Sequence, residues 1–181
     1  MVPIYPSFRF LLAGIIVTVI LVIISQKAKK IERFILSSVW VAYICIMIGM
    51  TLPPTGDCGD MTIVEKLQYA PPWNLKPFTL IPGQFINMLH GQSGAARQFL
   101  GNIILFIPAG FFPPMLFPKQ RKWYGLFLPG LIWSLCIEIS QLILNLANLS
   151  DRAFDADDII LNVFGAMIGY IIYKIFFSKK T

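Results

Sequence analysis

The sequence predicts an all-α integral membrane protein, a single multi-pass domain (residues 1–181) built as a bundle of about five transmembrane helices. Hydrophobic residues make up 56% of the chain and charged residues only 13%, and the mean hydropathy is +0.70. Several apolar runs reach the length of about 18 residues that crosses the hydrocarbon core. A soluble domain would carry about 25% charged residues, so a soluble fold is excluded.

Five apolar runs are the expected transmembrane helices, and they cover residues 8–25, 35–52, 99–117, 124–149 and 159–177. Three lysines follow the first run where a signal peptide would have small residues for cleavage, so this run is expected to stay in the protein. Residues 53–98 form the longest polar stretch and are expected to be an extracellular loop. Within this loop, Phe85 to Leu89 is a candidate for a short amphipathic segment lying on the membrane.

The third run contains Pro108, Pro113 and Pro114. These prolines could end the helix at Phe112 and make a re-entrant segment, which is tolerated only where protein or a watery cavity surrounds it. A re-entrant segment would place the basic residues 119–122 outside the cell, against the distribution of charge. We therefore expect a full span.

Basic residues set the expected orientation, because Lys and Arg stay on the cytoplasmic side. Ten of the fifteen basic residues fall on one side: four between the first and second runs, three between the third and fourth, and three around the end of the fifth. Seven of the nine acidic residues fall on the opposite side. We therefore expect the amino terminus outside and the carboxyl terminus in the cytoplasm of a bacterial plasma membrane.

Composition also removes several classes of function. A net charge of +6 would suggest nucleic-acid binding in a soluble protein, but here it follows from topology, so no nucleic-acid partner is expected. The three cysteines form no CxxC pair, and His90 is the single histidine. Neither a disulfide framework nor a His-rich metal site is therefore expected, and no cofactor is expected.

The fourth run contains a carboxyl group, Glu138, near its middle. An ionisable side chain within a span is costly and usually faces the bundle interior or a cavity. At about 100° per residue, the polar side chains of this run share an arc of about 80°, and they are Ser134, Glu138, Gln141, Asn145 and Asn148. Desolvation of the carboxyl must be met by a partner cation or by protonation. Arg152 is the first candidate partner, and Arg97 and Arg9 are the others.

The fifth run repeats this arrangement on a second helix. Asp158, Asn162, Gly165 and Gly169 lie on one narrow face. The two glycines form a GxxxG pattern, which lets a neighbouring helix approach closely. Asn102 lies near the external end of the third run. Three helices therefore each carry a polar residue in the outer half of the membrane.

Structural explanations compete with a binding site. Asp155 and Asp157 open a helix, where free amides and the macrodipole favour acidic residues as caps. Asn102, Gln141 and Asn162 could serve only to hydrogen-bond neighbouring helices together. Both explanations remain open at the level of sequence.

Four blocks of sequence carry these residues, namely 74–81 (NLKPFTLI), 101–110 (GNIILFIPAG), 134–141 (SLCIEISQ) and 152–170 (RAFDADDIILNVFGAMIGY). In this order, across residues 74–173, they resemble the VanZ-like family of bacterial membrane proteins, which is named for a glycopeptide-resistance protein. The resemblance implies a link to low-level resistance against teicoplanin, a glycopeptide that bears a fatty acyl chain. It implies no catalytic mechanism, so the motif positions mark an expected pocket without assigned roles.

The expected pocket near the outer leaflet comprises Glu138, Gln141, Arg152, Asp155, Asp157, Asp158, Asn162, Asn102, Asn74, Pro77 and Phe78. The first function considered is a non-catalytic factor that binds a lipoglycopeptide or a lipid-linked cell-wall precursor, with membrane lipids as surroundings. The second is an enzyme acting on a lipid headgroup. In that enzyme Glu138 would serve as acid or base, and Arg152 would bind a phosphate. A candidate divalent-ion site would consist of Asp155, Asp157 and Asp158. The third is a small proton-coupled transporter or flippase, although no inverted repeat is visible. The sequence does not predict the oligomeric state.

Overall fold

The computed structural model describes residues 31–52 and 61–177. The predicted helix at residues 8–25 therefore lies outside the described residues. The chain divides into two compact units, Met1–Pro53 and Pro54–Thr181. Each unit is described by itself.

The first unit contains helix α2, Ile31–Thr51. Its residues 33–51 form an apolar stretch long enough to cross a membrane. Two hydroxyl groups in this stretch donate to carbonyls of their own helix: Ser37 Oγ to Arg33 and Thr51 Oγ1 to Met47, both at 2.8 Å. Trp40 and Tyr43 stack with ring centroids 5.2 Å apart. A polar hydroxyl in hydrocarbon therefore costs little here, because the backbone supplies its acceptor.

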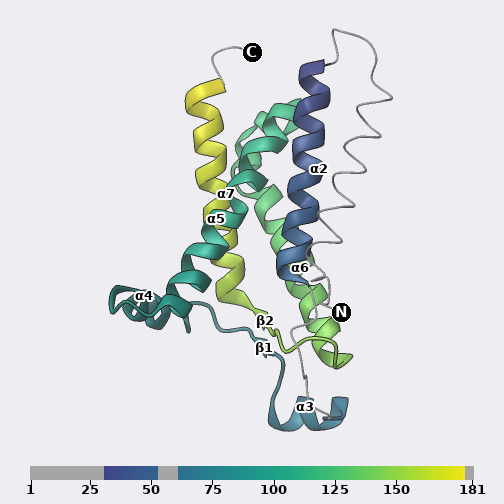
Figure 1. The fold of residues 1–181 in the computed structure, drawn as a ribbon, viewed down its shortest axis with the longest axis vertical. Helices are drawn as coiled ribbons and strands as arrows, with labels where there is room; N and C mark the ends of the chain where they lie inside the picture. The colour runs from purple at the N-terminus through teal and green to yellow at the C-terminus, as the bar shows by residue number, and fades with distance from the viewer. Residues whose placement is uncertain (1–30, 53–60, 178–181) are drawn as a thin grey trace, which may run out of the picture. The chain divides into compact units, whose positions relative to one another are not determined.

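The second unit is helical with one short pair of strands (Figure 1). In chain order its elements are α3 (Ile63–Tyr69), β1 (Trp73–Asn74), α4 (Ile81–Leu89), α5 (Ser93–Leu116), α6 (Leu128–Leu146), β2 (Phe154–Asp155) and α7 (Ala156–Phe177). Two 3₁₀ turns, Pro118–Arg121 and Trp123–Leu126, connect α5 to α6. Across the described residues, α2, α5, α6 and α7 are long and apolar enough to span a membrane. The predicted helical membrane class agrees with this architecture.

The prolines of the third apolar run do not end its helix at Phe112. Helix α5 continues through Pro108, Pro113 and Pro114 to Leu116, although each proline removes one hydrogen bond to the carbonyl four residues earlier. The backbone N–H of Phe117 closes the last turn on the carbonyl of Pro113 at 2.7 Å. Packing along α7 holds the helix together where local sequence alone would end it.

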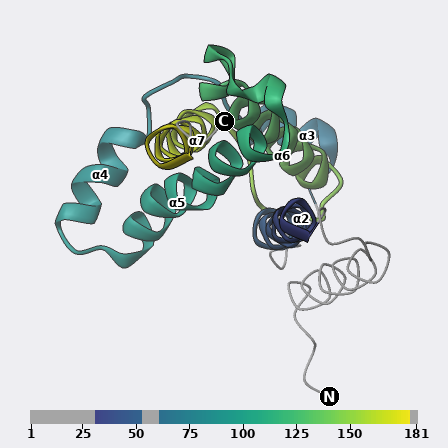
Figure 2. The ribbon, with the colours of Figure 1, turned by 90° about the horizontal axis from the view of Figure 1, so that it is seen from above.

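Glycines bring the backbones of α5 and α7 into contact. A Cβ atom at Gly165 would overlap the carbonyl oxygen of Ile103, and one at Gly169 would overlap that of Ile107. On the α5 side, a Cβ at Gly110 would overlap the carbonyl of Ala166. Small residues allow this approach, and the resulting van der Waals contact drives helix association where lipid gives no hydrophobic force. Figure 2 shows α5 running beside α7.

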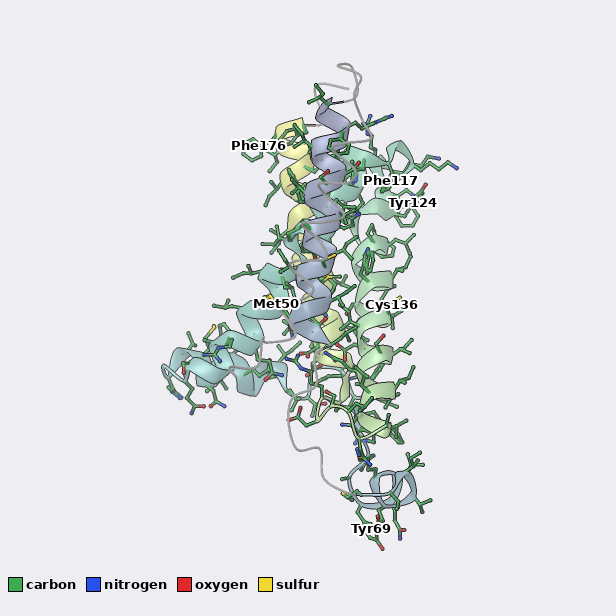
Figure 3. The ribbon with its side chains drawn as sticks, turned by 45° about the vertical axis from the view of Figure 1, so that its right-hand side comes forward. Met50, Tyr69, Phe117, Tyr124, Cys136 and Phe176 are labelled. Atoms are coloured by element: carbon green, nitrogen blue, oxygen red, sulfur yellow. The ribbon has the colours of Figure 1, made fainter. Side chains whose placement is uncertain are left out.

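The turns between α5 and α6 are tied to the carboxyl-terminal half of α7. The Tyr170 hydroxyl is shared between the carbonyls of Arg121 and Lys122, at 2.8 and 3.0 Å. Lys174 Nζ donates to the same Arg121 carbonyl at 3.2 Å. Figure 3 shows Phe117 and Tyr124 at this end of the unit and Tyr69 of α3 at the opposite end. The turns between α5 and α6, which contain Arg121 and Lys122, therefore lie at the opposite end of the helices from the polar site described next.

Candidate functional site

Two short strands join the loop after α3 to the start of α7. β1 and β2 pair in parallel, with Trp73 opposite Phe154 and Asn74 opposite Asp155. The side chain reinforces this pairing, because Asn74 Nδ2 donates to Asp155 Oδ1 at 3.1 Å. The polar residues of the loop are thereby placed against the polar residues of α6 and α7.

Asp157 is fully buried and binds the backbone of a different helix. Its Oδ1 accepts the N–H of Phe78, and its Oδ2 accepts those of Leu80 at 2.6 Å and Ile81 at 3.1 Å. Leu80 is the N-cap residue of α4 and provides no side-chain cap of its own, Ile81 is the first residue of the helix, and Phe78 lies two residues before the N-cap. Phe78 has a positive φ of 60°, which turns the chain so that all three amides face one carboxylate. Asp157 thus caps α4 from α7.

Glu138 is almost fully buried, with 2% of its surface exposed. Its Oε2 accepts the backbone N–H of Asp155 at 2.8 Å. Asp155 Oδ1 in turn accepts the N–H of Asp157 at 2.8 Å, which is the bond of an N-cap residue at the start of α7. Arg152, the first candidate partner named in the sequence analysis, lies near enough for its charge to act weakly on both Glu138 and Asp158. A line of carboxyl groups therefore crosses from the middle of α6 to the first turn of α7.

Two amides link the helices beside these carboxyl groups. Asn102 Nδ2 of α5 donates to Asp158 Oδ1 at 2.6 Å. Asn162 Nδ2 of α7 donates to Ser134 Oγ of α6 at 2.9 Å. Within residues 31–52 and 61–177, Asn162 Oδ1 is buried and has no hydrogen-bond partner. Turning the amide over would only move the missing bond to the nitrogen, because Ser134 is the one partner of this amide among the described residues. This amide is the unsatisfied position of the site.

We call these residues the polar cluster, which consists of Asn74, Asn102, Ser134, Glu138, Arg152, Asp155, Asp157, Asp158 and Asn162. Gln141 is buried on the same face of α6 as Glu138. Pro77 and Phe78 of the expected pocket have exposed side chains, and only the backbone of Phe78 reaches the cluster. The expected helix-packing residues Gly165 and Gly169 face α5.

Each of the three neighbouring aspartates accepts hydrogen bonds within the protein. Across the described residues, no group of three or more His, Cys, Asp or Glu side chains is placed to hold a metal ion. Both oxygens of Asp157 are occupied by backbone N–H groups, and Asp155 Oδ1 is occupied by Asp157 and Asn74. A cation would have to displace these bonds. The aspartates instead organise the loop before α4 and the start of α7.

Lys66 is a member of the site that the sequence did not indicate. It is buried, with 6% of its surface exposed, and its Nζ donates to the backbone carbonyl and, at 3.1 Å, to the Oδ1 of Asn145. Asn145 Nδ2 donates onward to the Arg152 carbonyl at 3.0 Å. Thr62 and Glu65 form a capping box on the same helix, and the backbone N–H and then the hydroxyl of Thr62 lower the pKa of Glu65. Helix α3 is thereby fastened to the end of α6.

The fold and the site define a class: a multi-pass membrane protein with buried carboxyl and amide groups at one end of its helices. The sequence profile of the VanZ/LLP1 family matches residues 39–177, which is most of the chain, and the chain belongs to this family. The resemblance seen in the sequence blocks is thereby confirmed. Searches of curated proteins and of solved structures gave no match.

Proposed function

We propose that this protein is a non-catalytic factor of the bacterial plasma membrane that binds the polar part of an amphiphile at the polar cluster, near the outer leaflet. The amphiphile is a teicoplanin-type lipoglycopeptide or a lipid-linked cell-wall precursor, and binding gives low-level resistance to such antibiotics. Membership of the VanZ/LLP1 family supports the link to glycopeptides. Exposed apolar side chains along the spans, such as Ile104, Ile143 and Phe164, suit a ligand that also has an acyl chain.

The unsatisfied amide of Asn162 carries this proposal. A buried polar atom without a partner costs about 1–3 kcal/mol, so native proteins rarely keep one without a reason. Asn162 lies one turn from Asp158 on α7, and its partner Ser134 lies one turn from Glu138 on α6. A polar group of a ligand that reaches this level between the helices would supply the missing bond.

The bonds of the carboxyl groups favour binding over catalysis. A catalytic Glu138 would have to exchange a proton with the ligand. Instead, its Oε2 holds the backbone of Asp155, and Asp157 holds three backbone amides. These groups fix the shape of the site, which is the role expected in a binding protein.

The test compares susceptibility to teicoplanin and to vancomycin in cells that carry an empty vector, the wild type or variants. The wild type is expected to raise the inhibitory concentration of teicoplanin and leave that of vancomycin unchanged. Asn162→Leu is expected to abolish the gain at equal amounts of protein in the membrane, because it removes the amide that would bind the ligand. Ser140→Ala is the matched control, because the Ser140 hydroxyl bonds only the Cys136 carbonyl of its own helix. Equal susceptibility with and without the wild-type protein would refute the proposal.

A further inference from the structure

Helix α4 has an apolar face that is largely exposed in the part of the chain that the structure describes. At about 100° per residue, Pro82, Phe85, Ile86 and Leu89 share an arc of about 100°. The exposed fractions of Phe85, Ile86 and Leu89 are 44%, 52% and 67%. Asn87 lies on the other side of the helix, outside this arc. The helix is therefore amphipathic, and most of its apolar side is exposed.

The axis of α4 runs across the membrane-spanning helices. Figure 1 shows α4 extending sideways from the unit, at a large angle to α7. Figure 2, seen from above, shows α4 along its length while α7 is seen nearly end-on. Because α7 is one of the candidate spans, an axis across it lies along the membrane plane. This is the orientation of an interfacial helix, which buries its apolar face at the boundary between headgroups and acyl chains.

The length of α5 indicates the depth at which α4 lies in the membrane. With 24 residues at about 1.5 Å each, α5 is about 36 Å long, which exceeds the hydrocarbon thickness of about 30 Å. Its first turns carry exposed polar residues, Arg97 and Gln98, and so extend into the headgroup layer. The rings of Phe85 and Phe99 lie 5.7 Å apart and hold α4 beside this end. Helix α4 therefore lies level with the headgroup boundary.

The span beside α4 also exposes apolar side chains near this contact. Leu100 and Ile104 of α5 are 42% and 61% exposed, and they follow Phe99 by one and five residues. Lipid that surrounds this part of the span is therefore also close to α4. Arg97, exposed on the polar turn beside it, suits the phosphate of a lipid headgroup. The neighbouring span and this charge both indicate phospholipid.

We propose that α4 is an interfacial helix whose face of Phe85, Ile86 and Leu89 is inserted among the phospholipids at the same end of the helices as the polar cluster. Asp157 fixes the amino end of α4 from within the cluster. The helix therefore holds the cluster at the level of the headgroups. This inference stands whether or not the cluster binds an antibiotic.

The test uses single-cysteine variants of the full chain, with Cys45, Cys58 and Cys136 replaced by alanine, labelled with a nitroxide in phospholipid vesicles. Phe85→Cys and Leu89→Cys report on the apolar face, and Asn87→Cys is the control on the same helix. The measurement is the ratio of collision rates with oxygen, which concentrates in the bilayer, and with a water-soluble nickel chelate. The ratio is expected to exceed one at Phe85→Cys and Leu89→Cys and to fall below one at Asn87→Cys.

Other outcomes overturn the proposal in distinguishable ways. A ratio below one at all three positions would place α4 in water. A ratio above one at all three would bury the whole helix in hydrocarbon. Low collision rates with both reagents at Phe85→Cys and Leu89→Cys would show that protein, such as a second copy of the chain, covers the face. None of these results depends on antibiotic susceptibility, so the failure of this inference is separate from the failure of the proposed function.

Discussion

The backbone N–H of Asp155 donates to Glu138 Oε2 at 2.8 Å, and this bond fastens the segment before α7 to the middle of α6. Both residues are buried, so water does not replace the bond when it is lost. The group that Asp155 requires is an oxygen acceptor, and a carboxylate and an amide both provide one.

Glu138→Gln is therefore expected to fold, whereas Glu138→Leu is expected to be less stable by about 1–3 kcal/mol because the amide of Asp155 loses its acceptor. Thermal unfolding of the purified proteins in detergent compares the two. A Tm for Glu138→Leu equal to that of Glu138→Gln would show that the bond does not contribute to stability. Loss of resistance in Glu138→Gln without loss of Tm would assign the carboxyl group to the ligand.

Asp157→Asn is expected to loosen the start of α4. The asparagine side chain has one acceptor oxygen where aspartate has two. At least one of the backbone N–H groups of Phe78, Leu80 and Ile81 therefore loses its acceptor. Hydrogen exchange measured by mass spectrometry should become faster in the peptide that covers these residues. Gln68→Ala, on the exposed side of α3, is the control and should leave exchange there unchanged. Unchanged exchange in Asp157→Asn would contradict the capping role.

Periodicity predicted the helices and their polar faces because helix geometry is local. The arc of polar residues on α6 and the glycine face of α7 follow from a rotation of about 100° per residue. The effect of Pro113 was harder to predict, since the local rule ends a helix there, whereas α5 continues to Leu116 in a folded unit where it packs against α7. Asp157 shows the same limit: its position predicts a cap for its own helix, yet it caps α4, whose amides lie far away in sequence.

Contacts between distant segments were not predictable from one sequence. Lys66 and Asn145 are 79 residues apart, and nothing near either residue indicates the other. Lys66 was counted only as one of the basic residues on the external side. Its burial depends on where α3 docks, which is set by tertiary packing.

Gly165→Ala and Gly169→Ala are expected to destabilise the protein, each by about 1–3 kcal/mol, because the added methyl group forces α5 and α7 apart. Gly101→Ala is the matched control in α5, where a Cβ would meet nothing within 4 Å. That substitution is expected to be neutral or to stabilise the protein by about 0.4–1 kcal/mol, because alanine lowers the conformational entropy of the unfolded chain. Thermal unfolding in detergent measures all three. Equal Tm values for Gly165→Ala and Gly101→Ala would argue against the close helix contact.

Lys66→Met is expected to release α3 from the end of α6. The substitution keeps an apolar stem but leaves the carbonyl and side-chain oxygens of Asn145 without their donor, at a cost of about 1–3 kcal/mol. Limited proteolysis of vesicles should cut faster within residues 62–70. Lys76→Met, at an exposed lysine, is the control and should be cut like the wild type. Identical cleavage of both variants would show that Lys66 does not hold α3 against α6.

The orientation of the helices decides which face of the membrane the polar cluster serves. The charge distribution predicts that Lys122 lies in the cytoplasm and Asp151 outside. In intact cells, Asp151→Cys should react with a membrane-impermeant maleimide, and Lys122→Cys should react only after permeabilisation, both in a chain whose native cysteines are replaced. The cluster lies at the Asp151 end, because Arg152 interacts with Glu138 and Asp158 there, whereas α7 binds the Lys122 carbonyl at its other end. The reverse labelling would put the cluster at the cytoplasmic leaflet, where an antibiotic acting outside the cell could not reach it.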